Sequence, residues 1–409
     1  MVFRYLDRPR GGSSSSAFYD FSLGSLPSGV TLTRASAGYR TNSAGILASE
    51  TTNVARFDYT PVTLAARGLL VEEARTELYT YNNDLSNAVW VYNGCTPTHN
   101  STAGPDGTVT ATLLTEGVTT AQNVGRLASA YVLNTIYMHR VYAKANTRNW
   151  IAVYWDPNRF GGTGFSYFNV STGALGTASA GMNTFIRPVA NGFYECTVIG
   201  VCTSTGNGNN SVWLANADNG RTYTGDGVSS LYYWGWGLQA GSTADQFIST
   251  GAAAATRSAD VALITNASAI SDQCWIIRAR TPRKLTAGAA NTVFQVDDGA
   301  NNNRRAIYYQ NGILTVLVQN AGVTQCSINT AAVANDTDFI LACRFADNNF
   351  AVSLNGGAIV TDLSGTNPVG LTAARVGVLA TGGFAWNSTI KTIETRRTAT
   401  DAELPLLST

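Results

Sequence analysis

The sequence predicts an all-β, multi-domain protein assembled from β-sandwiches. Charged residues make up only 13% of the 409 residues, against about a quarter in ordinary globular proteins, and glycine occurs 40 times. The Glu/Lys/Leu-rich stretches that favour helices are absent, and short apolar segments alternate with turn residues instead. Asn-Gly pairs begin at Asn191, Asn311 and Asn355, where both residues tolerate the positive φ of a hairpin turn. The length allows two or three domains with separate cores.

Charge and hydropathy exclude several functional classes. The formal net charge of +1 predicts no basic face for nucleic acid. No stretch approaches the roughly 18 apolar residues of a membrane-spanning helix. Positions 1–10 contain several charged residues where a secretion signal would have an apolar segment, so we expect no secretion signal there. A phosphate-binding Gly-rich loop with its Lys-Ser/Thr is also absent from the sequence. We therefore expect no nucleic-acid partner, no membrane span and no cofactor.

Cysteine and histidine usage argues against a metal centre. The six cysteines stand at positions 95, 196, 202, 274, 326 and 343, and none forms a Cys-x-x-Cys pair. His99 and His139 are the only histidines, which leaves no zinc-ligand spacing. We expect the cysteines to be buried, reduced thiols of a protein made in the cytosol.

The first part of the chain divides into an arm and a β segment. Residues 1–22 have the composition of an attachment arm, because Arg4, Arg8 and Arg10 precede a flexible Gly/Ser stretch; a disordered terminus is the alternative. Residues 23–81 form an N-terminal β segment, with alternation at 30–33 and a buried run at 68–71.

Four stretches resemble motifs of tailed-phage virion proteins of the head-spike or tail-fibre type. They are VTLTRAS at 30–36, ARFDYTPVTL at 55–64, RGLLVEEARTEL at 67–78, and the junction from YWGWGLQAGSTADQF at 233–247 to TRSADV at 256–261. Thr60 and Glu77 depart from the family's Asp and Asn. The resemblance covers about residue 20 onward and implies a structural part of a virus particle.

Two further resemblances divide the remainder. Residues 82–250, opening with NDLSNAVW at 83–90 and carrying the hairpin 187–196, resemble jelly-roll modules related to carbohydrate-binding domains, with Phe193 and Glu195 as departures. Residues 258–409 resemble laminin-G-like, concanavalin-type sandwiches. There we predict a final strand over 390–397 and a capping box at 400–403 that opens a single helical turn, ended by Pro405.

No catalytic residue emerges from the sequence. A nucleophilic triad needs an oriented histidine, and no Gly-x-Ser-x-Gly stretch accompanies His99 or His139. Acids that could form a glycosidase pair include 72–73, 297–298, Asp218, Asp226 and Asp245, but strand ends and loop tips are the simpler interpretation. We expect no enzymatic activity and no metal.

Aromatic density in the middle unit suggests a sugar-binding surface. Sugar CH faces stack on aromatic rings, while Asp, Asn and Arg hydrogen-bond hydroxyl groups. Core packing is the competing explanation for each ring. The candidate carbohydrate-binding residues are Trp155, Phe160, Trp213, Asp218, Arg221 and Tyr223, of which Trp155, Phe160 and Tyr223 lie next to turns.

Together these features predict a virion protein, assembled in the host cytoplasm, that mediates attachment to a host-surface glycan. The N-terminal arm would contact other virion proteins. A homo-oligomer is expected, with a trimer favoured, although heptad and fibre repeats are absent. The alternatives are a capsid decoration protein without sugar binding and a tailspike polysaccharide depolymerase.

Overall fold

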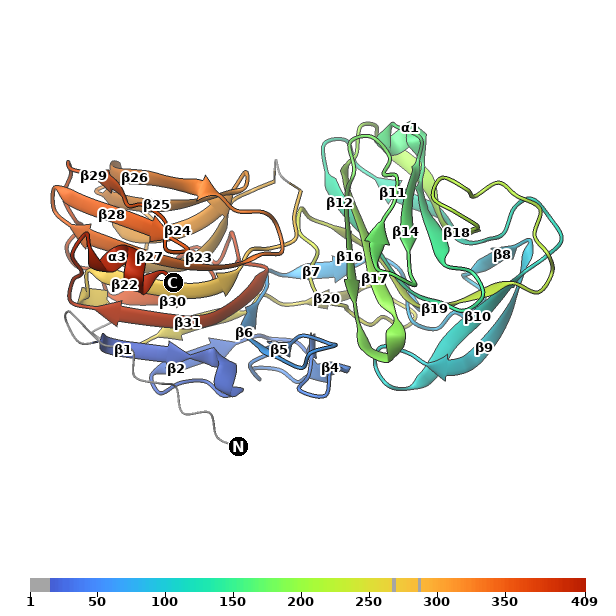
Figure 1. Ribbon diagram of the computed structural model, residues 1–409, viewed down its shortest axis with the longest axis horizontal. Helices are drawn as coiled ribbons and strands as arrows, with labels where there is room; N and C mark the ends of the chain where they lie inside the picture. The colour runs from blue at the N-terminus through green and yellow to red at the C-terminus, as the bar shows by residue number, and fades with distance from the viewer. Residues whose placement is uncertain (1–14, 267–269, 286–287) are drawn as a thin grey trace.

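Two β-sandwiches lie side by side along the long axis of the molecule (Figure 1). The computed structural model describes residues 15–266, 270–285 and 288–409. Its strand pairs are all antiparallel, and its helices are limited to short turns. The all-β, multi-domain sandwich prediction is confirmed.

The middle sandwich consists of two facing sheets. The first has the order β16 (Asn183–Pro188), β17 (Tyr194–Val201), β12 (Ile136–Ala145), β19 (Ser230–Ala240), β10 (Val109–Glu116) and β9 (Cys95–Ala103). The second has the order β15 (Ala174–Leu175), β14 (Phe165–Asn169), β13 (Trp150–Trp155), β18 (Gly206–Ala215), β11 (Asn123–Tyr131) and β8 (Val91–Asn93). Helix α1 (Pro157–Phe160) follows β13, with Pro157 in the first turn where its missing N–H costs nothing.

The C-terminal sandwich is built in the same way. One sheet has the order β29 (Val360–Asp362), β28 (Asn349–Leu354), β27 (Asp338–Ala346), β22 (Cys274–Arg280), β31 (Ser388–Arg396), β6 (Ala66–Val71) and β5 (Phe57–Tyr59), with β1 (Ser15–Asp20) also on β31. The other has the order β2 (Val30–Thr33), β21 (Val261–Ile264), β30 (Ala373–Val376), β23 (Asn291–Asp297), β24 (Arg304–Gln310), β25 (Ile313–Asn320) and β26 (Val323–Ala332).

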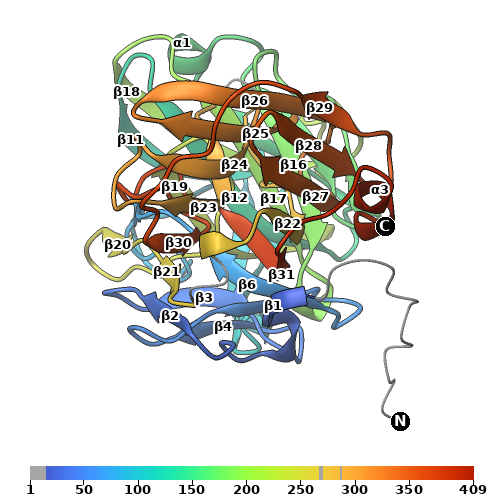
Figure 2. The same ribbon diagram turned by 90° about the vertical axis from the view of Figure 1, so that its left-hand side faces the viewer.

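The N-terminal strands complete the C-terminal sandwich, whereas the sequence suggested a separate segment over 23–81. β1 and β6 pair with β31, and β2 pairs with β21 (Figure 2). Phe57, Leu69 and Val71 enter the same core as Trp275 and Trp386. Local patterning predicted the strands but not their partners, because the partners lie 228 to 381 residues away along the chain.

A short β ribbon joins the two sandwiches. β7 (Arg75–Glu77) pairs with β20 (Ala255–Arg257) and reaches β19 of the middle sandwich through a Glu77–Gln239 pairing. The chain passes from one sandwich to the other twice, through β7 and through β20, and both passages lie side by side between the two sandwiches in Figure 1.

The backbone conformations of the hairpin turns agree with the sequence prediction. Asn191, Asn311 and Asn355 have φ of 58°, 52° and 51°, and the glycine after each is also at positive φ. The predicted hairpins are therefore present. At the C-terminus, Glu403 Oε2 accepts from the Thr400 N–H at 2.7 Å, which is one of the two hydrogen bonds of a capping box, although the helix itself begins at Glu403 with Ala402 as its N-cap.

The predicted end of the last helix was wrong. Helix α3 (Glu403–Leu407) contains Pro405 and continues beyond it. Pro405 lies in the first turn, where a backbone N–H has no intrahelical partner, so the proline does not break the helix.

The expectation of buried, unpaired cysteines has a direct structural counterpart. All six cysteines have free thiols, and five of them are buried. Within the described residues, no helix is long and apolar enough to cross a membrane.

Candidate functional site

An aromatic cluster covers the outer face of the second sheet of the middle sandwich. Residues alternate between the two faces of a strand, so Ile151, Val153 and Trp155 of β13 point into the core. Ala152 and the half-buried Trp150 and Tyr154 therefore occupy the opposite face, where they are joined by Phe165 and Tyr167 of β14 and by Trp213 of β18.

The rings in this cluster contact one another directly. The Phe165 ring centroid lies 4.8 Å from that of Tyr154 and 5.8 Å from that of Trp213, the latter edge to face. Trp213 Nε1 donates to Ser211 Oγ at 2.7 Å, which fixes the orientation of the indole. Such contacts hold the rings rigid, so a ligand that stacks on them would lose little additional side-chain entropy.

Arg221 supplies a cation at the centre of the aromatic cluster. Its guanidinium carbon lies 4.0 Å from the Phe165 ring centroid and 5.4 Å from that of Trp213. The loop that carries Arg221 is fastened by Asp218, whose carboxylate accepts from Thr177 N at 2.8 Å and from Thr177 Oγ1 at 3.0 Å. The cluster thus combines half-exposed rings with a planar group of hydrogen-bond donors.

Trp155 and Phe160 do not belong to this surface, which corrects the sequence prediction. They are only 1% and 4% exposed, with ring centroids 4.0 Å apart in the core. Trp155 Nε1 donates to His139 Nδ1 at 2.8 Å. Burial lowers the pKa of His139 to about 3, so the imidazole is a neutral structural acceptor.

Tyr223 also has a structural role, apart from the aromatic cluster. Its hydroxyl donates to Glu116 Oε2 at 2.6 Å, and the Arg148 guanidinium lies 5.0 Å from its ring centroid. Glu116 is buried and also accepts from Arg148 and from the Asp226 N–H. Tyr223 therefore fastens a loop at the end of the sandwich.

Three of the six predicted site residues, Trp213, Asp218 and Arg221, thus come together. Trp150, Tyr154, Phe165 and Tyr167 were not singled out, although strand parity contains the signal. In β13 the odd positions include the branched aliphatic residues Ile151 and Val153, which suit the core and leave the even positions on the outer face. The arginines proposed for virion attachment, Arg4, Arg8 and Arg10, lie outside the described residues.

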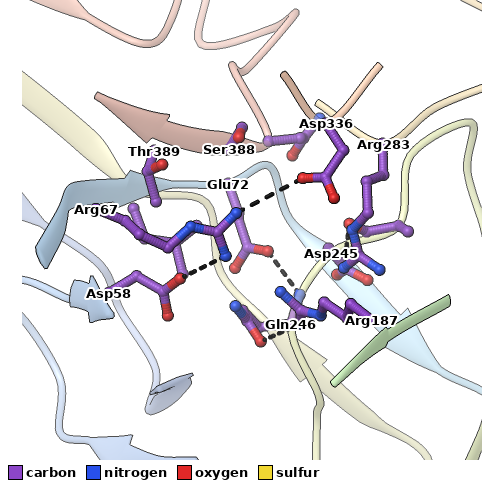
Figure 3. Close-up of a pocket in the computed structure, with 13 residues that line it drawn as sticks. Asp58, Arg67, Glu72, Arg187, Asp245, Gln246, Arg283, Asp336, Ser388 and Thr389 are labelled. Carbon is purple, nitrogen blue, oxygen red and sulfur yellow. Dashed lines mark hydrogen bonds and ion pairs between the residues drawn. The ribbon is translucent and has the colours of Figure 1, made fainter. Parts of the chain in front are cut away.

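A second polar site lies where the two sandwiches meet (Figure 3). Its first half is centred on Asp260, which accepts from Arg34 Nη1 at 3.0 Å, from the Glu72 N–H at 2.9 Å and from Arg56. Glu72 in turn pairs with Arg56 and Arg257. Burial alone would raise the pKa of Glu72, yet Arg257 and Arg56 hold it below its usual value.

The second half of the junction is centred on Glu195 of the middle sandwich. Its carboxylate lies 2.8 Å from Arg187 Nη2 and 2.7 Å from Arg283 Nη1, the latter contributed by the C-terminal unit. Burial opposes ionisation, but Arg187, Arg283 and Arg140 hold the pKa of Glu195 well below its usual value. Asp245 links the halves by pairing with Arg140 at 3.0 Å and with Arg257 at 2.9 Å.

The junction surrounds a small cavity that its charged side chains fill. Figure 3 shows Arg67 between Asp58 and Asp336, and Arg187 beside Gln246. The remaining volume is about 20 Å³, which is room for a single water molecule. The junction is therefore a structural ion-pair network, and the phage-like sequence motifs supply most of its members.

The acids considered as catalytic candidates are engaged in such contacts. Glu72 and Asp245 belong to the junction, and Asp297 pairs with Arg375 at 2.6 Å. Asp218 fastens a loop, and Asp226 accepts from the Ser229 N–H at 2.7 Å. Each of these carboxylates is a structural acceptor.

Glu77, beside the junction, makes the stability of the protein depend on pH. Its Oε1 accepts from Leu238 N at 2.7 Å, and burial raises its pKa to about 8. This pKa exceeds the value of about 4.3 in the unfolded chain. The contribution of protonated Glu77 to the free energy of unfolding is therefore complete below pH 4.3 and is lost as the pH rises through 8. Gln239 Nε2 lies 3.2 Å from Glu77 Oε2, and Gln239 Oε1 has no partner among the described residues. With the Gln239 side-chain amide turned by 180°, its oxygen can accept a hydrogen bond from the protonated Glu77 carboxyl group.

Glu77→Gln is expected to keep the acceptor oxygen and to remove this pH dependence. Unfolding free energies measured by urea titration between pH 5 and 7.5 should fall by about 3 kcal/mol for the native protein and stay level for the variant. Parallel curves for the two proteins would mean that Glu77 is ionised in the folded state throughout.

Comparison with known proteins gives weak similarity only. No family model and no curated protein matches the chain. Among solved structures, the CBM40 of a Ruminococcus gnavus IT-sialidase, bound to alpha2,6 sialyllactose, is 14% identical, with 35% of this chain and 85% of that chain covered and a TM-score of 0.30. Domains LG4-5 of the mouse laminin alpha1 chain are 8% identical, with 72% and 92% covered and a TM-score of 0.25. TM-scores this low bear on neither the ligand nor the activity of this chain.

Proposed function

We propose that the protein binds a host-surface glycan through the aromatic cluster and does so as a structural component of a phage virion. The observation that carries the proposal is the grouping of the half-buried rings of Trp150, Tyr154 and Trp213 with Arg221 on the outer face of one sheet. In a monomeric protein such rings are more usually buried, and their presence on an outer face favours a ligand with apolar surfaces.

The arrangement suits a sugar chain in chemical terms. A pyranose ring would stack its CH face on Trp213 or Tyr154, and Arg221 would donate hydrogen bonds to hydroxyl or acidic groups. Each site would be weak, and several copies on one particle would raise the overall affinity through avidity. The virion assignment rests on the resemblance of the junction motifs, whose charged residues form the ion-pair network.

Under this proposal the protein is a binding component without catalytic activity. It would be assembled into the particle in the host cytoplasm, as a homo-oligomer, with the N-terminal arm contacting other virion proteins. A second candidate is a capsid decoration protein that binds no sugar. The buried network between the sandwiches suits it equally, because a particle surface and a receptor-binding site both benefit from two domains held rigidly together.

Binding of the purified protein to a panel of host-surface polysaccharides tests the proposal, with the chain lengths of the same samples measured afterwards. Saturable binding without shortening is expected. Shortened polysaccharide would identify a depolymerase, and absence of binding at high protein concentration would favour the decoration protein. Antibody labelling of intact particles would test the virion assignment independently.

A further inference from the structure

Arg221 of the aromatic cluster has a guanidinium group whose hydrogen-bond donors are largely unused. The rings of Phe165 and Trp213 lie against it, with centroids 4.0 and 5.4 Å from the guanidinium carbon. Nη1 makes a long contact of 3.4 Å with Thr222 Oγ1, and the side chain also reaches the Tyr167 hydroxyl. Because arginine has five N–H donors, most of them are left without a partner in the part of the chain that the structure describes.

Arg148 of the same sandwich shows what distinguishes Arg221. Both guanidinium groups lie over an aromatic ring, that of Arg148 at 5.0 Å from the Tyr223 ring centroid. Arg148 also binds the Glu116 carboxylate, with an Nη2–Oε1 distance of 2.6 Å and an Nε–Oε2 distance of 3.0 Å. No carboxylate of the described residues lies within ion-pairing distance of Arg221. The cation of the aromatic cluster therefore lacks the acidic partner that the other stacked arginine has.

Two acids lie at the margins of the aromatic cluster, and both bind other groups. Asp218 accepts from Thr177 N at 2.8 Å and from Thr177 Oγ1 at 3.0 Å, through its two oxygen atoms. Asp156 accepts from a backbone N–H at the start of α1 at 2.9 Å. Burial raises the pKa of Tyr167, and Arg221 opposes this increase more strongly than Asp218 adds to it. At the Tyr167 hydroxyl the positive charge thus outweighs the neighbouring negative one.

The rings extend far enough for a chain of several sugars. Trp150 and Tyr154 are four residues apart on the outer face of β13, which places them about 13 Å apart along the strand. Trp213 of β18 is paired in register with the residue midway between them. Arg221 lies against Trp213, so a sugar held at Arg221 would have room for neighbouring sugars along β13 in both directions.

We propose that the glycan is acidic and that Arg221 binds the carboxylate of one of its sugars. This inference rests on the proposed binding of a glycan at the aromatic cluster. The planar guanidinium group matches the two oxygen atoms of a carboxylate and can donate to both at once. The rings occupy the face of the group and leave the edge that carries the donors for the ligand. Neighbouring sugars would stack on the exposed parts of Trp150 and Tyr154.

Reduction of the carboxyl groups tests this inference separately from glycan binding itself. The probes are the polysaccharides of the binding panel, each offered intact and after conversion of its carboxyl groups to hydroxymethyl groups, with dissociation constants measured by calorimetry. The native full-length protein should bind a carboxyl-bearing chain, and reduction should weaken that binding about tenfold. Equal affinity for both forms, or binding only of chains without carboxyl groups, would overturn the inference and leave the proposed function standing. Absence of any binding would overturn both.

Two variants locate the carboxylate. Arg221→Gln should bind the intact and the reduced chain alike, because the group that distinguishes them is gone. Arg397→Gln makes the same change of charge at an exposed arginine directly after β31 of the C-terminal sandwich, and it should keep the native preference. A native preference in Arg221→Gln would overturn the inference, since another cation would then bind the carboxylate. The comparison of intact and reduced chains on the native protein remains decisive should Arg221→Gln fail to fold.

Discussion

Replacing Asp260 by Asn is expected to destabilise the protein by about 3–5 kcal/mol. The carboxylate is fully buried and serves Arg34, Arg56 and the Glu72 backbone at once. An amide keeps the volume but removes the charge, which leaves the buried Arg34 without an acidic partner among the described residues and leaves Arg56 paired with Glu72. The free energy of unfolding from chemical denaturation, with calorimetry alongside, measures the loss.

Asp338→Asn provides the matched control. Asp338 also pairs with an arginine, Arg280, at 2.9 Å, but its side chain is 80% exposed. Exposed ion pairs contribute at most about 1 kcal/mol, so this variant should unfold almost as the native protein does. Equal losses in the two variants would mean that burial of the network does not determine its energetic importance.

Trp213→Ala is expected to weaken polysaccharide binding by about 2 kcal/mol, or roughly thirtyfold, because it removes a half-buried ring of the outer face that contacts Arg221. The variant also frees Arg221 from one of its two aromatic contacts. Titration of the polysaccharide into native and variant protein, followed by calorimetry, gives both dissociation constants.

Phe18→Ala is the control for general loss of an exposed ring. Phe18 is 52% exposed on β1 of the C-terminal sandwich, far from the aromatic cluster in sequence and in sheet. Its replacement should leave the affinity unchanged. Equal weakening by both substitutions would contradict the assignment of the site, as would native affinity in Trp213→Ala with an intact near-ultraviolet spectrum.

The sequence was informative wherever the relevant interaction is local. Turns at Asn191 and Asn311 follow from backbone preferences of adjacent residues, and the strands follow from alternation. The junction is different, since Arg56 and Asp260 are separated by 204 positions and only the fold brings them together. For the same reason the pairing of β6 with β31 lay beyond local patterning.

The candidate site shows why the sequence argument selected a buried tryptophan as a surface residue. Proximity to a turn selected Trp155 as a surface ring, but exposure within a strand depends on parity. Trp155 shares its face with Ile151 and Val153, whereas Trp150 and Tyr154 share the other. Arg221, which the sequence also suggested as a site residue, lies over the rings of Phe165 and Trp213.

Indole NMR signals of the native protein during titration with an oligosaccharide of the bound polysaccharide test the central claim most directly. The eight tryptophans give separate reporters, and only Trp150 and Trp213 belong to the aromatic cluster. Glycan binding at this face predicts saturable shifts of these two signals, with the core indoles of Trp155 and Trp275 unchanged. Saturable binding that leaves Trp150 and Trp213 unshifted would contradict the account.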